Sequence, residues 1–144
     1  MLMRDIRSKV DKLVKYHRTR DPFAMVKGMN VILVRYPLVG IRGFYQYFKR
    51  NNIIYIDEAL SDTDQKFVLA HELGHMLLHK KSNAIFMDTR TCLNTSRYEM
   101  EADMFAMQLL VSDEDIEEYK DYTLEQLSRT LGYHQKLVGL RLRK

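Results

Sequence analysis

The sequence predicts an α+β fold in which a small three-stranded sheet, mixed or antiparallel, packs against helices. Apolar residues recur at helical spacing at 3–17, 61–79 and 97–110, and three short β-branched or aromatic segments lie between the first two of these stretches. The chain has 144 residues, of which 46% are hydrophobic, so it can bury the core of one domain. We expect that domain to span residues 1–112, with a small helical extension at 113–144 packed on it.

Two helices are predicted at the start of the chain. At residues 3–17, apolar side chains recur every three or four positions and basic side chains occupy the remaining face. The apolar set is Ile6, Val10, Leu13 and Val14. Asp21 is a suitable N-cap and Pro22 a suitable first residue for a second, short helix, which Gly28 ends.

Three strands are predicted after these helices. Residues 30–34 are rich in β-branched side chains, and Pro37 and Gly40 interrupt the chain after them. Residues 43–48 and 52–57 form a predicted hairpin around a polar turn. We expect the aromatic side chains of 43–48 in the core of the sheet rather than on a surface that stacks nucleic-acid bases.

The strongest chemical signal is the sequence His71-Glu72-Leu73-Gly74-His75 within an apolar segment. Residues four apart lie on the same face of a helix, so His71 and His75 can both direct an imidazole nitrogen at one metal ion. Glu72 then lies beside that ion without binding it. This is the HExxH arrangement of zinc-dependent peptidases, with two ligands and a general base for the attacking water. A surface helix that carries two histidines by accident would not have such apolar flanks.

The helix that carries this motif is expected to begin at Ser61 or Asp62 and to end at about His79. Gln65 would complete a capping box with Asp62. Gly74 costs about 1 kcal/mol relative to alanine within a helix, which indicates that another backbone or the substrate approaches closely there. A third histidine one turn beyond the first two does not converge on the same ion, so we expect His79 to be a cap or a hydrogen-bonding residue.

A loop and a second helix follow the motif. Residues 84–95 show no clear period, which predicts a loop with a short strand at 85–87. The helix predicted at 97–110 carries three carboxylates among apolar residues. Those apolar neighbours indicate that the carboxylates are not simply solvated surface charges.

This second helix supplies the candidates for a third metal ligand. A catalytic zinc site has three protein ligands and leaves one position to water. Glu99 and Asp103 are four apart and share a face, whereas Glu101 lies about 200° from Glu99 around a straight helix. We take Glu99 as the ligand and Asp103 as an acceptor that orients a ligand histidine from the second shell of the site. Glu101 as the ligand is the alternative.

The C-terminal residues predict short helices. Ser112 can cap the acidic segment 113–118, and Thr123, with a glutamine three residues later, begins another helix that Gly132 ends. Residues 124–142 also resemble part of a helix-turn-helix motif. We favour two short helices packed on the catalytic core over DNA binding by this segment.

Composition and charge exclude other classes of protein. The single cysteine, Cys92, leaves no internal disulfide and indicates a reducing cytoplasm. No apolar run approaches the ~20 residues of a membrane span, and we expect neither a signal peptide nor a membrane partner. Residues 1–60 carry twelve Lys or Arg against five Asp or Glu, and residues 61–144 carry eleven against fourteen. We expect the basic charges to form a solvated helix face rather than a nucleic-acid site.

The two helix motifs together resemble the ImmA/IrrE metallopeptidases. The run His71-Glu72-Leu73-Gly74-His75-Met76-Leu77-Leu78-His79 is followed some twenty residues later by Glu99-Met100-Glu101-Ala102-Asp103-Met104-Phe105-Ala106. With the aromatic hairpin upstream, the resemblance covers roughly residues 40–112. Relatives often have Asn at the position of Asp103 and Pro at that of Ser112, and neither departure changes the metal site.

The resemblance implies a gluzincin-like site on zincin-type helices, with His71, His75 and Glu99 as the zinc ligands. It also implies a cytoplasmic endopeptidase of a bacterium, plasmid or prophage that acts as an anti-repressor. Such an enzyme cleaves a helix-turn-helix repressor and so regulates transcription of a mobile element or a stress regulon. The protein partner expected from the resemblance is therefore that repressor.

The residues by themselves support metal-assisted hydrolysis, with Zn²⁺ as the expected metal and Mn²⁺ as the alternative. The metal lowers the pKa of its water toward ~7, and Glu72 takes the proton and passes it to the leaving amine. The alternative function is a metal-containing binding module, either a DNA-binding regulator or a sequestering anti-repressor. Glu72 argues against that alternative, because a structural metal site needs no general base.

Overall fold

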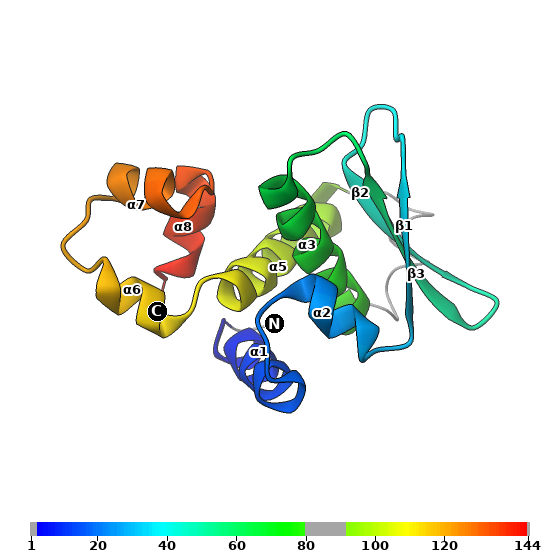
Figure 1. The fold of residues 1–144 in the computed structure, drawn as a ribbon, viewed down its shortest axis with the longest axis horizontal. Coiled ribbons are helices and arrows are strands. Elements are labelled where there is room, and N and C mark those ends of the chain that lie inside the picture. Colours follow the sequence, from blue (N-terminus) through cyan, green and yellow to red (C-terminus); the bar gives the residue numbers. More distant parts are fainter. Residues whose placement is uncertain (1–2, 80–91, 144) are drawn as a thin grey trace.

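A computed structural model describes residues 3–79 and 92–143, and within them it contains seven helices and three strands (Figure 1). The elements in chain order are α1 (Met3–His17), α2 (Pro22–Lys27), β1 (Val31–Tyr36), β2 (Gly43–Phe48), β3 (Asn51–Asp57), α3 (Asp62–His79), α5 (Cys92–Leu110), α6 (Asp113–Glu118), α7 (Leu124–Leu131) and α8 (Gln135–Arg141). The predicted α+β fold with short C-terminal helices is therefore confirmed. None of these helices is long and apolar enough to cross a membrane.

The three strands form a mixed sheet in the order β1-β3-β2. β1 pairs in parallel with β3, and β2 pairs with β3 in an antiparallel hairpin in which Tyr45 lies opposite Ile54. The hairpin turn consists of Lys49 and Arg50, both with positive φ (48° and 67°), and it is shorter than the predicted polar turn because β3 already begins at Asn51. Among the described strands, β2 is therefore an edge strand, paired on one side with β3.

Only one face of the sheet is covered by the described helices (Figure 1). Tyr45, Ile54 and Ile56 are buried on that face. Phe44 and Tyr55 stack on each other, with ring centroids 4.3 Å apart. Tyr47 and Phe48 are about half exposed, at 50% and 52%, so the prediction that the aromatic side chains of β2 fill the core is correct for Tyr45 and wrong for these two.

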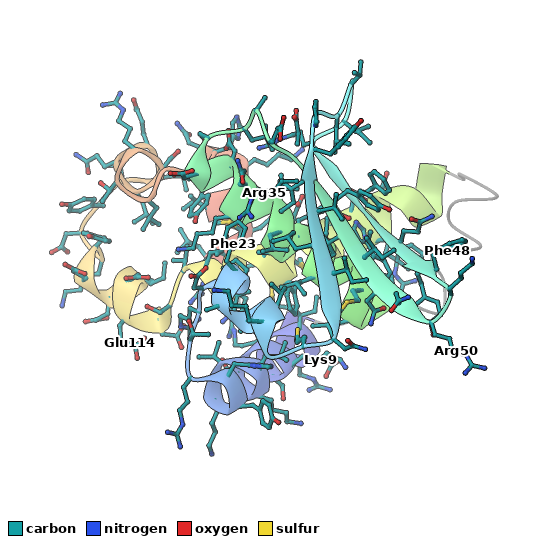
Figure 2. All side chains as sticks on the ribbon, turned by 45° about the vertical axis from the view of Figure 1, so that its right-hand side comes forward. Lys9, Phe23, Arg35, Phe48, Arg50 and Glu114 are labelled. Atoms are coloured by element: carbon teal, nitrogen blue, oxygen red, sulfur yellow. The ribbon has the colours of Figure 1, made fainter. Side chains whose placement is uncertain are left out.

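Contacts between side chains attach α2 and α3 to the sheet. The guanidinium of Arg35 in β1 lies 4.8 Å from the ring centroid of Phe23 in α2 (Figure 2), and its Nε donates a hydrogen bond to Oε1 of Gln65 at 3.1 Å. Phe48 and Arg50 lie at the far end of the hairpin (Figure 2). Arg35 therefore joins the edge strand opposite β2 to the first turn of α3.

The first turn of α3 is capped by Ser61, whose Oγ accepts a hydrogen bond from the Asp64 amide at 3.2 Å. Asp62 is the first helical residue, so the predicted Asp62–Gln65 capping box is wrong. The side-chain Nε2 of Gln65 instead donates to the Leu60 carbonyl at 3.0 Å. Ser61 lies directly before the first helical residue, which is the position of an N-cap.

The close approach predicted at Gly74 is made by α5. A Cβ at Gly74 would lie 3.1 Å from Cβ of Phe105 and 3.2 Å from Cα of Ala102, so the absence of a side chain lets the two helices meet. α5 begins at Cys92, five residues before the predicted start, and so takes up residues assigned to a loop. The predicted strand at 85–87 lies outside the described residues.

The caps predicted for the C-terminal residues are confirmed for α6 and α7. Ser112 and Thr123 each form a capping box, and Gly132 ends α7 with a φ of 84°. Leu127 and Val138 are buried in one cluster with Met107 of α5 and its neighbour Val111, at the end of α5 remote from the sheet (Figure 1). This cluster is separate from the larger core beneath the sheet. The domain boundary at residue 112 stays a prediction.

Candidate functional site

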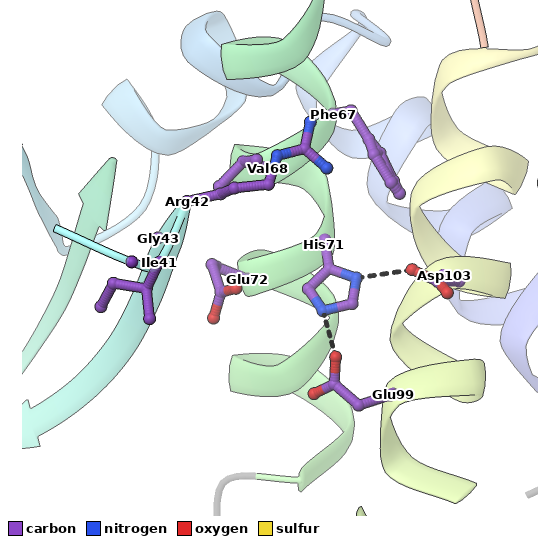
Figure 3. A pocket seen from close by; sticks show the side chains of 10 residues that line it. Ile41, Arg42, Gly43, Phe67, Val68, His71, Glu72, Glu99 and Asp103 are labelled. Carbon is purple, nitrogen blue, oxygen red and sulfur yellow. Dashed lines mark hydrogen bonds and ion pairs between the residues drawn. The ribbon is translucent and has the colours of Figure 1, made fainter. Parts of the chain in front are cut away.

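The HExxH side chains lie in the middle of α3, where it packs against α5. The rings of His71 and His75 are one turn apart, with centroids 4.8 Å from each other. Glu72 points toward the start of β2 rather than toward α5 (Figure 3), and it is 8% exposed. The apolar residues that flank the motif are buried, which fixes this face of the helix.

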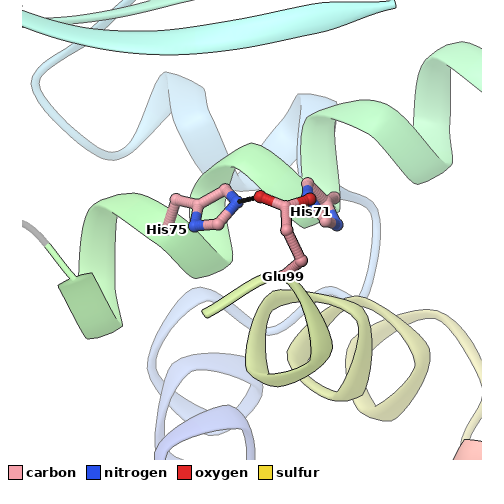
Figure 4. A group of neighbouring side chains, drawn as sticks. All are labelled: His71, His75 and Glu99. Atoms are coloured by element: carbon pink, nitrogen blue, oxygen red, sulfur yellow. Dashed lines mark hydrogen bonds and ion pairs between the residues drawn. The ribbon is translucent and has the colours of Figure 1, made fainter. Parts of the chain in front are cut away.

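Glu99 of α5 reaches both histidines (Figure 4). Its Oε2 is 3.1 Å from Nε2 of His71, and its Oε1 is 2.7 Å from Nε2 of His75. One ligand atom from each of the three side chains lies within 4.8 Å of the others. The structure thus brings together the two histidines and the carboxylate predicted from spacing.

The geometry fits a divalent metal ion held by these three side chains. Ligands at about 2.0–2.1 Å from a tetrahedral zinc are roughly 3.3 Å from one another. The 3.1 Å and 2.7 Å separations around Glu99 are slightly shorter, because the same atoms hydrogen-bond directly to each other. Two imidazoles and one carboxylate are a donor set of catalytic zinc sites, which leave one position to water.

Asp103 lies one turn beyond Glu99 and contacts the other side of a histidine ring. Its Oδ1 is 2.8 Å from Nδ1 of His71 (Figure 3). In a neutral ring, a proton on Nδ1 would donate to this carboxylate and leave Nε2 as the nitrogen that can bind a metal. The structure places Asp103 where the sequence predicts an orienting acceptor.

Glu101, the alternative ligand, lies away from this group. Its Oε1 is 2.7 Å from Nε2 of His79, and Nδ1 of His79 is 3.0 Å from Nδ1 of His75. His79 and Glu101 are both 5% exposed. His79 is a hydrogen-bonding residue as predicted, but its pairing with Glu101 was missed. The sequence offered two signs of this pairing. His79 lies one helical turn after the predicted ligand His75, and Glu101 lies two residues after the predicted ligand Glu99.

Burial and these hydrogen bonds together shift the pKa values of the side chains in the site. Burial lowers the pKa of His71, but hydrogen bonds to Asp103 and Glu99 outweigh it and raise the pKa to about 10. Burial raises the pKa of Glu99, and its hydrogen bonds to the two histidines reverse this and hold the pKa well below its usual range. Burial raises the pKa of Glu72, with partial compensation from the same histidines. Burial also lowers the pKa of His79.

A cavity of about 450 Å³ opens beside these side chains, within the range of ligand-binding pockets. One wall is formed by α3 and α5, through Phe67, Val68, His71, Glu72, Glu99 and Asp103, and the other by residues 40–43 (Figure 3). A role for residues 40–43 in this site could not be predicted from the sequence, because they lie far from the motif in the chain.

Gly43 holds the edge strand against the motif helix. A Cβ at this position would lie 2.5 Å from Cγ1 of Val68 and 2.7 Å from the carbonyl oxygen of Tyr55. The lack of a side chain therefore lets the first residue of β2 approach α3 one turn before His71. As a result, the edge of the sheet lies beside His71 and Glu72.

Comparisons with known proteins point to the same chemistry. The family model of the IrrE N-terminal-like domain, peptidase family M78, matches residues 24–143. The chain is 35% identical over 139 residues to uncharacterized immunity region protein 2 of Bacillus phage phi105, covering 94% of this chain and 88% of the phage protein. It is 29% identical over 119 residues to metallopeptidase ImmA of Bacillus subtilis (strain 168), covering 81% of this chain and 69% of ImmA.

Proposed function

Because the chain belongs to the ImmA/IrrE family of M78 peptidases, we propose that it is a zinc-dependent endopeptidase that cleaves a helix-turn-helix repressor. The observation that carries the catalytic part is the meeting of His71, His75 and Glu99 beside a buried Glu72. The repressor part is supported by the similarity to a protein of a phage immunity region.

In this proposal His71, His75 and Glu99 hold the metal, with Zn²⁺ favoured over Mn²⁺ by the donor set. Asp103 orients His71 through the 2.8 Å hydrogen bond to Nδ1. When bound, the metal supplies Lewis-acid polarisation of the scissile carbonyl and activation of a water molecule. The proton transfers are carried out by a side chain of the protein.

Glu72 is the general base in this mechanism. It lies on the cavity wall beside His71 and faces the start of β2 (Figure 3). Its carboxylate takes a proton from the water that attacks the carbonyl carbon, and the same proton then passes to the leaving amine nitrogen. Burial raises its pKa, which makes the carboxylate a stronger base toward the water and its acid form a donor to the amine.

The edge of β2 is the proposed docking site for the substrate backbone. β2 pairs only with β3 among the described strands, and its first residue lines the cavity. An extended peptide could add to this edge as a further strand, which would place a carbonyl beside the metal ligands. Such docking selects a segment that can leave its own fold, for example a linker between two repressor domains.

The remaining predictions are part of the same proposal. We assign residues 1–112 to the catalytic domain and 113–144 to an extension whose helices α7 and α8 pack on the end of α5 rather than bind DNA. Burial of Leu127 and Val138 beside Met107 supports this assignment. We place the protein in the cytoplasm, where a repressor would be found.

The test is to incubate the protein and its Glu72→Gln variant with a repressor encoded beside its gene and, separately, with casein. Fragments are then mapped by mass spectrometry. We expect cleavage of the repressor at one or a few sites by the wild type, none by Glu72→Gln, and little digestion of casein. Equal digestion of both substrates would contradict the single-partner proposal. Inactivation of the repressor by Glu72→Gln as well would favour sequestration, the alternative function.

A further inference from the structure

His79 and Glu101 form a buried chain of contacts that leads to a proposed metal ligand. Nδ1 of His75 is 3.0 Å from Nδ1 of His79, and Nε2 of His79 is 2.7 Å from Oε1 of Glu101. We propose that His79 and Glu101 are positioning residues, which fix the ring orientation and the tautomer of His75 for metal binding. This inference rests on the metal centre of the proposed function.

Metal binding by His75 would fix the direction of each proton in this series of contacts. If Nε2 of His75 binds the metal, the neutral ring carries its proton on Nδ1 and must donate it to Nδ1 of His79. His79 then accepts at Nδ1 and carries its own proton on Nε2, which donates to the Glu101 carboxylate. With His75 neutral and bound to the metal through Nε2, this arrangement places one proton and one lone pair at each of the two short contacts.

The two ligand histidines are supported in different ways. Nδ1 of His71 contacts the Asp103 carboxylate directly, at 2.8 Å. No carboxylate of α5 takes the same place for His75, because Glu101 points to another side of that helix than Glu99. The imidazole of His79, one turn after His75 on the same helix, spans the distance to Glu101.

Burial of His79 and Glu101 lowers the stability of the fold unless each of their polar atoms has a hydrogen-bond partner. His79 and Glu101 are each 5% exposed, and a carboxylate at this depth requires a hydrogen-bond donor. A pair that served only the packing of α3 on α5 could be replaced by apolar residues. The contact of His79 with Nδ1 of His75 indicates that the pair does more than pack the two helices, because it orients the ring of a proposed ligand. Arg97, whose Nε lies 3.6 Å from the other carboxylate oxygen of Glu101, is exposed.

The test measures zinc affinity by competition with a chromophoric chelator. We expect His79→Ala to lower the affinity by roughly 10–100-fold, as loss of such supporting groups does at other metal sites. His79→Asn should restore part of it, because the Asn side-chain oxygen can accept the proton of His75 although the contact with Glu101 is lost. Glu101→Ala should resemble His79→Ala. Arg97→Gln is the matched control and should bind zinc like the wild type.

A spectroscopic readout separates positioning from packing. In the zinc-loaded protein with ¹⁵N-labelled histidine, long-range ¹H–¹⁵N spectra show which ring nitrogen carries a proton. We expect His75 to be protonated on Nδ1 and His79 on Nε2. Denaturant unfolding of each metal-free variant shows whether a loss of affinity merely reflects a loss of folded protein.

Two results would overturn the inference while leaving the metal centre intact: wild-type zinc affinity in His79→Ala, or a proton on Nδ1 of His79. Equal losses in His79→Ala and His79→Asn, with normal folding of both, would also count against it. If zinc binding by the wild type did not depend on His71, the metal centre itself would be refuted, and this inference with it.

Discussion

At the scale of residues, the ring nitrogens of the two motif histidines are engaged on both sides. Nε2 of His71 and Nε2 of His75 face Glu99, and their Nδ1 atoms face Asp103 and His79 respectively. Each ring is therefore held in one orientation before any ligand binds. This preorganisation lowers the cost of assembling a metal site from two separate helices.

The contribution of Asp103 can be tested by substitution. We expect Asp103→Ala to weaken zinc affinity or peptidase activity by roughly 10–100-fold, because His71 loses the acceptor that orients it. Asp103→Asn should have a milder effect, since its amide oxygen can accept the same hydrogen bond. Affinity and activity are measured on all three proteins. Unchanged values in Asp103→Ala would show that the carboxylate does not support the site.

Proton release on metal binding tests the electrostatics of the site. The pKa of His71 is raised to about 10, so in the metal-free protein this ring is protonated at pH 7. The metal requires the neutral ring, so binding releases about one proton from His71, and zinc affinity falls as the pH is lowered below that pKa. Titration calorimetry in buffers of different ionisation enthalpy measures this number. Release of no proton at pH 7 would contradict the assignment of His71 as a ligand.

At the scale of elements, the position of β2 beside α3 depends on Gly43. We expect Gly43→Ala to lower the free energy of unfolding by about 1–3 kcal/mol, as overpacking does. The added methyl would meet Val68 and the backbone of Tyr55 at 2.5 Å and 2.7 Å, so the strand must move away from the cavity. Denaturant unfolding measures the effect.

Gly139 of α8 provides the control for this substitution. A Cβ there would have no neighbour within 4 Å, so Gly139→Ala should raise the stability by up to about 1 kcal/mol through helix propensity. Equal effects of the two substitutions would mean that the contact of Gly43 with α3 is not tight.

Features that depend on local sequence could be predicted. The caps Ser112, Thr123 and Gly132 and the β2–β3 hairpin are local features, and they form where local chemistry places them. Helix geometry likewise places His71 with His75 on one face of α3, and Glu99 with Asp103 on one face of α5. That the two faces meet was predicted only from the need of a catalytic zinc site for a third ligand.

Contacts between distant segments could not be derived in this way. The parallel pairing of β1 with β3 joins strands separated by a third one, and the sequence left mixed and antiparallel sheets open. Residues 40–43 enter the cavity wall because β2 packs on α3. The His79–Glu101 contact requires the rotation of α3 about α5 to be known, and no periodicity supplies it.

At the scale of the whole molecule, the site lies where three parts of the chain meet. α3 and α5 supply the side chains, the start of β2 supplies the opposite wall, and the C-terminal helices pack on the far end of α5 (Figure 1). In the proposed function, the edge of β2 receives the substrate, and the C-terminal helices support α5. Specificity for one protein partner would then come from docking along the sheet rather than from deep side-chain pockets.

The central claim is that this arrangement is a catalytic metal site, and the metal content of purified variants tests it most directly. Elemental analysis should find about one zinc per chain in the wild type and in Glu72→Gln, with peptidase turnover lost only in the latter. His71→Ala, His75→Ala and Glu99→Ala should each lose the metal. Full retention of zinc in Glu99→Ala together with its loss in Glu101→Ala, or no metal in the wild type, would contradict the account.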